Sequence, residues 1–111
     1  MAVNEIMEKL KAIRHYYYSG SRCINREDEY GNMRAELILK ANVLFKVSIP
    51  EYIRYYPYRL ENTYYVLESG EVFRKYYLDT GESACEKLTI DDLLEEIREA
   101  REKGKRIEIL G

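Results

Sequence analysis

The longest regular pattern in the chain is an alternation of apolar and polar positions between Ala35 and Ile49. Every second residue in this stretch is apolar, and most of the residues between them are polar. A period of two predicts a β-strand with one buried face. A helical interpretation of part of the stretch remains open, although it would bury Leu39, Val43 and Val47 less well.

A straight strand over the whole of 35–49 does not fit a compact domain. At about 3.3 Å per residue it would span roughly 50 Å, whereas a domain of this size has a diameter of about 35 Å. We therefore expect a bend, a bulge or turn near Lys40–Asn42, or a protruding end that pairs with a second chain. Pro50 is expected to end the strand.

Two segments carry the apolar stripe of an amphipathic helix. The first runs from Val3 to Tyr17. The second follows Thr89, which is placed as an N-cap three residues before Asp92, and Gly104 is expected to end it.

The remaining segments predict further strands and loops. Residues 63–67 and 71–78 are expected to form a hairpin around 68–70, and 106–110 to form a short last strand. Three segments are expected to be irregular: 19–33 and 79–83 as loops, and 51–59 as a connector in which Pro57 bars a central strand. Together these elements predict a single α+β domain over residues 1–111, with an antiparallel sheet of about 4–5 strands packed against an N-terminal and a C-terminal helix.

Composition and charge narrow the class of protein. Apolar residues make up 46% and charged residues 34% of the 111 residues, which is typical of a globular domain. The net charge of −2 gives no support for a nucleic-acid or membrane partner. No apolar run approaches the roughly 20 residues of a membrane helix, and the first residues lack the pattern of a secretion signal. We expect a cytoplasmic protein.

The chain has 12 tyrosines but no tryptophan and no glutamine. Few thermolabile amides together with many Glu, Lys and Arg residues are typical of hyperthermophiles. In this respect the composition resembles that of small proteins from hyperthermophilic archaea and their viruses. The resemblance implies a thermophilic source and, for a viral protein, the cytoplasm of the host.

The two cysteines, Cys23 and Cys85, lie too far apart in the sequence to form a metal or redox motif. In an ordinary cytosol both would be free thiols, whereas hyperthermophile cytosols also contain structural disulfides. Both alternatives remain open at this point. A disulfide between them would close a long loop and add roughly 4 kcal/mol of stability.

No motif predicts catalysis. The only histidine, His15, lies near the end of the first predicted helix, and no Gly-rich nucleophile turn accompanies it. The glycines are scattered singly, so no phosphate-binding loop is present. We expect a protein that is not an enzyme, with no cofactor and no metal.

Tyrosine interleaved with arginine is the pattern most relevant to function. Consecutive strand residues face opposite ways, so each tyrosine pair in the hairpin must place one ring outside. Tyr and Arg are enriched at the energetic centres of protein interfaces. The candidate binding residues are Tyr52, Arg54, Tyr55, Tyr56, Tyr58, Arg59, Arg74 and Tyr76.

Two functions follow from this pattern. The first is a small protein-binding module, such as an accessory or inhibitor protein encoded by a virus or plasmid, with self-association as a homodimer included. The second is a nucleic-acid or nucleotide binder that uses the same rings as a stacking platform. The small net charge argues against a long track of phosphate contacts, so the first function is favoured.

Overall fold

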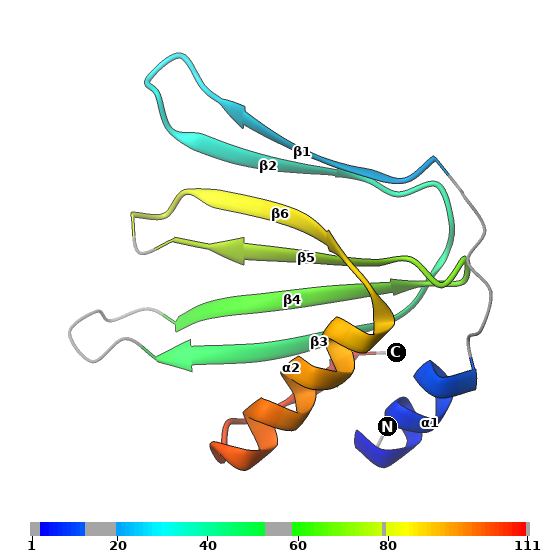
Figure 1. The fold of residues 1–111 in the computed structure, drawn as a ribbon. Helices are drawn as coiled ribbons and strands as arrows, with labels where there is room; N and C mark the ends of the chain where they lie inside the picture. The colour runs from blue at the N-terminus through cyan, green and yellow to red at the C-terminus, as the bar shows by residue number, and fades with distance from the viewer. Residues whose placement is uncertain (1–2, 13–19, 53–58, 79, 111) are drawn as a thin grey trace.

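The computed structural model describes residues 3–12, 20–52, 59–78 and 80–110 (Figure 1). Two helices and seven strands make up this part of the chain. In chain order they are α1 Val3–Ala12, β1 Arg22–Glu27, β2 Met33–Ile38, β3 Val43–Tyr52, β4 Arg59–Leu67, β5 Val72–Tyr77, β6 Ser83–Leu88, α2 Ile90–Glu102 and β7 Glu108–Leu110. The predicted α+β class with a helix near each end is confirmed.

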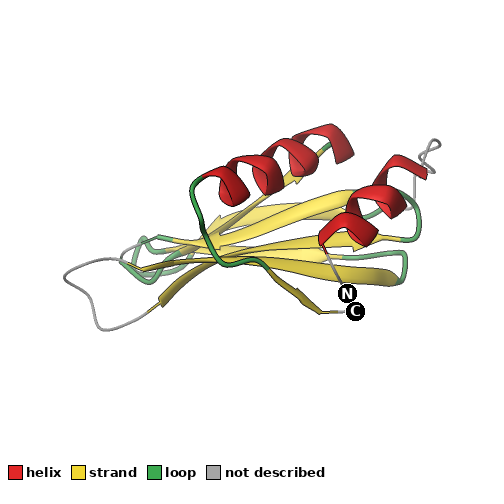
Figure 2. Cartoon of the chain, turned by 90° about the horizontal axis from the view of Figure 1, so that it is seen from below, coloured by secondary structure: helices red, strands yellow, loops and turns green. Residues whose placement is uncertain are grey.

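Five strands form the main sheet in the order β6-β5-β4-β3-β7, and every neighbouring pair is antiparallel. β1 and β2 form a separate antiparallel hairpin that lies beside β6 (Figure 1). Both helices lie on the same side of the main sheet (Figure 2). The sheet therefore has one face under the helices and one face that no described helix covers.

The core lies between the two helices and the sheet. α1 contributes Ile6 and Leu10, which are one helical turn apart and both fully buried. The other buried apolar side chains of this core come from α2 and from the sheet: Phe45, Val47, Ile49, Tyr64, Val66, Val72, Ile90, Leu93, Ile97 and Ala100. No described helix is long and apolar enough to cross a membrane.

α2 begins with the predicted capping box. The hydroxyl of Thr89 accepts a hydrogen bond from the N–H of Asp92, and the carboxylate of Asp92 accepts one from the N–H of Thr89. These two bonds satisfy N–H groups that a helix start otherwise leaves unpaired. The helix ends at Glu102. Gly104 follows with a φ of 68°, the left-handed conformation that commonly ends a helix, so its predicted role as the helix stop is confirmed.

The first predicted helix is confirmed over Val3–Ala12. Its predicted continuation to Tyr17 lies outside the described residues.

The prediction of a loop over 19–33 was wrong, because β1 occupies Arg22–Glu27. Its sequence, RCINRE, has no apolar alternation, so no strand pattern is visible. Pairing with β2 makes it a strand. The turn between them closes on Asp28, whose carboxylate accepts hydrogen bonds from the N–H groups of Tyr30 and Asn32, each at 2.9 Å.

The alternating stretch 35–49 is two strands and not one. β2 ends at Ile38 and β3 begins at Val43. Of the alternatives considered for this stretch, the turn near Lys40–Asn42 is the one that the structure contains. The N–H of Glu68 donates to the carbonyl of Asn42, which holds this connection beside the β4–β5 turn. The helical interpretation is wrong.

Pro50 does not end its strand, contrary to the prediction. β3 continues to Tyr52, and Pro50 pairs with Glu61 of β4. β7 pairs only with residues Lys46–Ser48 of β3, so among the described residues no strand lies beside Pro50 on the side away from β4. A proline is tolerated at such an edge because its missing N–H is not needed there.

The β4–β5 hairpin around 68–70 is confirmed, with the N–H of Leu67 bonded to the carbonyl of Glu71. The expected loop at 79–83 is a second hairpin turn. The N–H of Leu78 donates to the carbonyl of Glu82, and Ser83 already belongs to β6. β6 was not predicted. The predicted short last strand is confirmed as β7 over Glu108–Leu110.

A disulfide between Cys23 and Cys85 fixes the β1–β2 hairpin to β6, with the two Cα atoms 5.8 Å apart. Side-chain hydrogen bonds reinforce this contact. The N–H of Ala35 donates to the hydroxyl of Ser83 at 2.9 Å, and the N–H of Met33 donates to the carboxylate of Glu82 at 2.7 Å. The hairpin therefore covers the outer edge of the main sheet.

Candidate functional site

The strand register assigns side chains to the two faces of the main sheet. Tyr64, Arg74 and Glu86 form one cross-strand row. Because the core residue Tyr64 belongs to it, this row lies on the helix side. Tyr65 is the next residue along β4 and therefore points to the other face.

Two of the predicted binding residues, Arg74 and Tyr76, lie together on the helix side. The guanidinium of Arg74 is 4.3 Å from the centre of the Tyr76 ring. The same guanidinium bonds the Glu86 carboxylate at 2.7 Å and the Asn62 side-chain oxygen at 2.9 and 3.3 Å. Arg74 is thus held by partners inside the molecule.

Two of the other predicted binding residues, Tyr52 and Arg59, are described as ends of β3 and β4. Tyr52 is the last residue of β3 and pairs with Arg59, the first residue of β4. Arg54, Tyr55, Tyr56 and Tyr58 lie outside the described residues.

The face away from the helices carries a row of basic and aromatic residues that the sequence did not single out. Lys46, Tyr65, Phe73 and Lys87 are consecutive register partners across β3, β4, β5 and β6. The ammonium of Lys46 is 5.4 Å from the centre of the Tyr65 ring, and that of Lys87 is 6.0 Å from the centre of the Phe73 ring. Phe73 is fully buried, so Tyr65 is the aromatic side chain of this row that a partner can reach.

A third pair of this kind lies further along β5. The ammonium of Lys75 is 5.6 Å from the centre of the Tyr77 ring, which is 45% exposed. We call the surface formed by Lys46, Tyr65, Lys75, Tyr77 and Lys87 the lysine–tyrosine face. A lysine over an aromatic ring is held by the charge distribution of the ring and keeps its ammonium available to an anion.

The acidic groups on this side of the described sheet include Glu71 and Glu108, and the carboxylate of Glu108 lies 3.1 Å from the guanidinium of Arg106. The carboxylate of Glu71 is buried, accepts a hydrogen bond from the Ser69 hydroxyl at 2.8 Å and lies 3.3 Å from the ammonium of Lys87. The excess acid lies on the opposite side of the sheet, where α2 alone has six acidic and two basic residues. The described molecule is therefore polarised, with a basic sheet face and an acidic helix.

Apolar side chains border the lysine–tyrosine face at the β3–β7 edge. Leu110 pairs with Lys46 and is 59% exposed. Leu44 and Val43, at the start of β3, are also exposed. Exposed leucines next to lysine and tyrosine give a surface with both apolar and charged contacts to offer.

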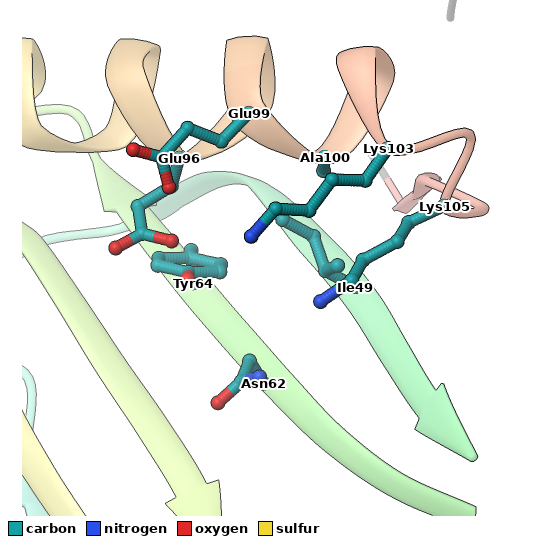
Figure 3. Close-up of a pocket in the computed structure, with 8 residues that line it drawn as sticks. All are labelled: Ile49, Asn62, Tyr64, Glu96, Glu99, Ala100, Lys103 and Lys105. Carbon is teal, nitrogen blue, oxygen red and sulfur yellow. The ribbon is translucent and has the colours of Figure 1, made fainter.

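A pocket of about 150 Å³ lies on the helix side, between α2 and the strands β3 and β4 (Figure 3). Apolar, acidic and basic side chains line it: Ile49, Asn62, Tyr64, Glu96, Glu99, Ala100, Lys103 and Lys105. Burial raises the pKa of the Tyr64 hydroxyl above its ordinary value of 10, and the neighbouring Glu96 carboxylate raises it further. Tyr64 therefore stays protonated at neutral pH.

The described residues do not by themselves identify a reaction or a ligand. The described part of the chain contains no group of three or more His, Cys, Asp or Glu residues that could hold a metal ion. The chain matches no known protein-family model, no curated protein and no solved structure.

Sequence reasoning overlooked the lysines of the lysine–tyrosine face. Lys46, Lys75 and Lys87 are far apart in the sequence and come together only through the register of four strands. One signal was present. Once 63–67 and 71–78 are paired around their turn, Tyr65 and Lys75 must lie on the same face of the hairpin.

Proposed function

We propose that this protein is a small non-enzymatic binding module whose contact surface is the lysine–tyrosine face and whose partner is an acidic protein surface. The observation that supports this most strongly is the position of three lysines, each beside an aromatic ring, on the sheet face without a described helix. Opposite charge on the partner would guide the encounter and fix its orientation.

The borders of the face favour a protein over a nucleic acid. Leu44 and Leu110 add exposed apolar area, and aromatic and apolar groups surrounded by polar ones are typical of protein interfaces. Three lysines, one of them paired with Glu71, are few for a track of phosphate contacts. A second copy of the chain belongs to the same class of partner, because α2 supplies an acidic surface.

The second candidate is short single-stranded nucleic acid. The pairing of Lys46 with Tyr65 and of Lys75 with Tyr77 favours it, because single strands bind through base stacking on aromatic rings and phosphate contacts to nearby cations.

Charge reversal on the face tests the proposal. The double variant Lys46→Glu and Lys75→Glu should no longer retain the protein that co-purifies with the wild type. Its matched control, Lys9→Glu and Lys11→Glu, changes two exposed lysines of α1 and should retain it. Retention by both variants, or loss from both, contradicts the proposal.

A binding assay with a labelled single-stranded oligonucleotide separates the two candidates. If the partner is a protein, the oligonucleotide should not bind even at low salt. Binding that weakens steeply with added salt and is abolished by Lys46→Glu and Lys75→Glu would replace the first candidate with the second.

We also propose that the protein acts in the cytoplasm of a thermophilic cell or host. The absence of glutamine and the abundance of Glu, Lys and Arg support a thermophilic source. A structural disulfide is consistent with that compartment, since intracellular proteins of hyperthermophiles contain them. A melting temperature above about 90 °C is expected, and one in the mesophilic range of about 45–65 °C would contradict it.

A further inference from the structure

The β1–β2 hairpin lies beside β6 but belongs to a separate sheet, with no backbone ladder between the two in the described residues (Figure 1). Every residue of β1 and β2 is at least partly exposed, so these strands supply no side chain to the buried core. In β6, by contrast, Ser83, Ala84 and Cys85 are buried. Since β6 is the last strand of the main sheet, the described element that covers its outer edge is the hairpin.

Side chains make the hydrogen bonds between the hairpin and β6 in the described part of the chain. The amide of Asn25 bonds the N–H and the carbonyl of Cys85, and the hydroxyl of Ser83 accepts from the N–H of Ala35. These bonds are only partly buried, so water can replace either partner and each adds little net stability. A two-stranded hairpin is itself only marginally stable. The covalent contact between the hairpin and β6 is the Cys23–Cys85 disulfide.

We propose that the Cys23–Cys85 disulfide is a redox latch, which holds the hairpin on β6 while oxidised and lets the hairpin open when a dithiol reduces it. One thiolate of the dithiol attacks the sulfur of Cys23, which is the more exposed of the two residues. The S–S bond breaks, and Cys85 leaves as a thiolate and takes up a proton. The second thiol of the dithiol then displaces Cys23, so that the dithiol becomes a disulfide and both cysteines become thiols.

Opening of the hairpin changes the edge of the main sheet. The N–H and the carbonyl of Cys85 lose their bonds to Asn25 and face the solvent. β6 then becomes an unpaired edge strand, which is the kind of surface on which another chain adds a strand. The redox state of the latch therefore controls whether this edge is accessible. The proposal rests on the contacts of the hairpin and is independent of the function proposed for the lysine–tyrosine face.

Amide hydrogen exchange, followed by NMR with and without dithiothreitol, tests the latch. In the reduced protein the Cys85 amide should exchange at least about tenfold faster than in the oxidised protein, because local opening exposes it. It should also exchange at least about tenfold faster than the amides of Tyr64 and Val66 in the same sample. Those two belong to β4, which has a strand on each side and is exposed only when the sheet unfolds. An unchanged rate at Cys85, or a rate no faster than in β4, would overturn the proposal.

Two single-cysteine variants test the opening without a reductant. Cys23→Ser retains Cys85, which is buried while the latch is closed, and Cys85→Ser retains the partly exposed Cys23. The reaction of each thiol with iodoacetamide is measured in the folded protein and divided by its rate in urea. If the hairpin opens, the two normalised rates should agree within about tenfold, since both thiols are then accessible. A Cys85 thiol that reacts more slowly than this would show that the hairpin stays closed without the disulfide, and would reject the latch.

Discussion

The side-chain amide of Asn25 bonds both backbone groups of Cys85. Its NH₂ group donates to the Cys85 carbonyl at 3.0 Å, and its oxygen accepts from the Cys85 N–H at 2.9 Å. β6 is the last strand of the main sheet, so Asn25 takes the place that a further strand would occupy. Unpaired strand edges are sites where other chains add, and the β1–β2 hairpin protects this one.

Replacing Asn25 by leucine should lower the free energy of unfolding by about 1–3 kcal/mol, because the buried N–H and carbonyl of Cys85 lose their partner. Urea denaturation measures the loss. Arg26→Leu, at the neighbouring exposed position of β1, should change stability by no more than about 0.5 kcal/mol. Equal midpoints for Asn25→Leu and the wild type would show that the amide does not stabilise the edge.

Loss of the Cys23–Cys85 disulfide should lower stability by roughly 4 kcal/mol on the chain-entropy estimate for a loop of this length. The comparison is urea denaturation with and without a reductant. The variant Cys23→Ala should unfold at a lower urea concentration than the oxidised wild type and should not respond to the reductant. If the wild type also fails to respond, the cross-link contributes nothing to stability.

The capping box should make stability depend on pH at the acidic end. The hydrogen bond from the Thr89 N–H lowers the pKa of Asp92 below its ordinary value of 3.8. A carboxyl group whose pKa is lower in the folded state stabilises the fold above its unfolded pKa, and this contribution is lost as the pH falls through the folded value. Asp92→Asn should therefore lose less stability than the wild type between pH values of about 6 and 3. Parallel losses in the two proteins would contradict this; Asp91→Asn, which changes an exposed neighbour, is the control.

Tyr64 should make stability depend on pH at the alkaline end. Its pKa is raised in the folded protein by burial and by Glu96, so its contribution is complete below the ordinary value of 10 and is lost as the pH rises above it. Tyr64→Phe has no hydroxyl to ionise and should show a weaker loss of stability above that pH in urea denaturation. At neutral pH the variant should be less stable by about 1 kcal/mol, the usual effect of losing one hydrogen bond, here between the Tyr64 hydroxyl and Glu96. An alkaline profile identical to that of the wild type would rule out this role.

The sequence was sufficient where a local pattern decides the structure. The stripe of Leu93 and Ile97 behind the Thr89 cap predicted α2, and the turn at 68–70 predicted the β4–β5 hairpin. The sequence was insufficient for β1 and β6, which are strands because they pair with the neighbouring strands β2 and β5. Arg22–Glu27 has no buried alternating face, and its pairing with β2, its disulfide and Asn25 hold it in place.

In the candidate surface, too, the local pattern predicted some features, and others depend on strands that the sequence did not reveal. Alternation along the hairpin implies that one ring of Tyr64-Tyr65 and one of Tyr76-Tyr77 lie on the outer face, and the structure places Tyr65 and Tyr77 there. The partners of Arg74 could not be deduced, because Glu86 belongs to β6, a strand that the sequence did not reveal. A binding partner would therefore have to compete with Glu86 and Asn62 for the guanidinium of Arg74.

Site-specific photo-cross-linking tests the role of the lysine–tyrosine face most directly. A photoreactive phenylalanine analogue at position 77 should form a covalent adduct with a partner protein in the cells that produce this chain. The same analogue at position 11 of α1, on the helix side, should form none. The adduct at position 77 should disappear when Lys46→Glu and Lys75→Glu are added. An adduct at position 11 without one at 77, or an adduct at 77 that survives the charge reversal, would contradict the account.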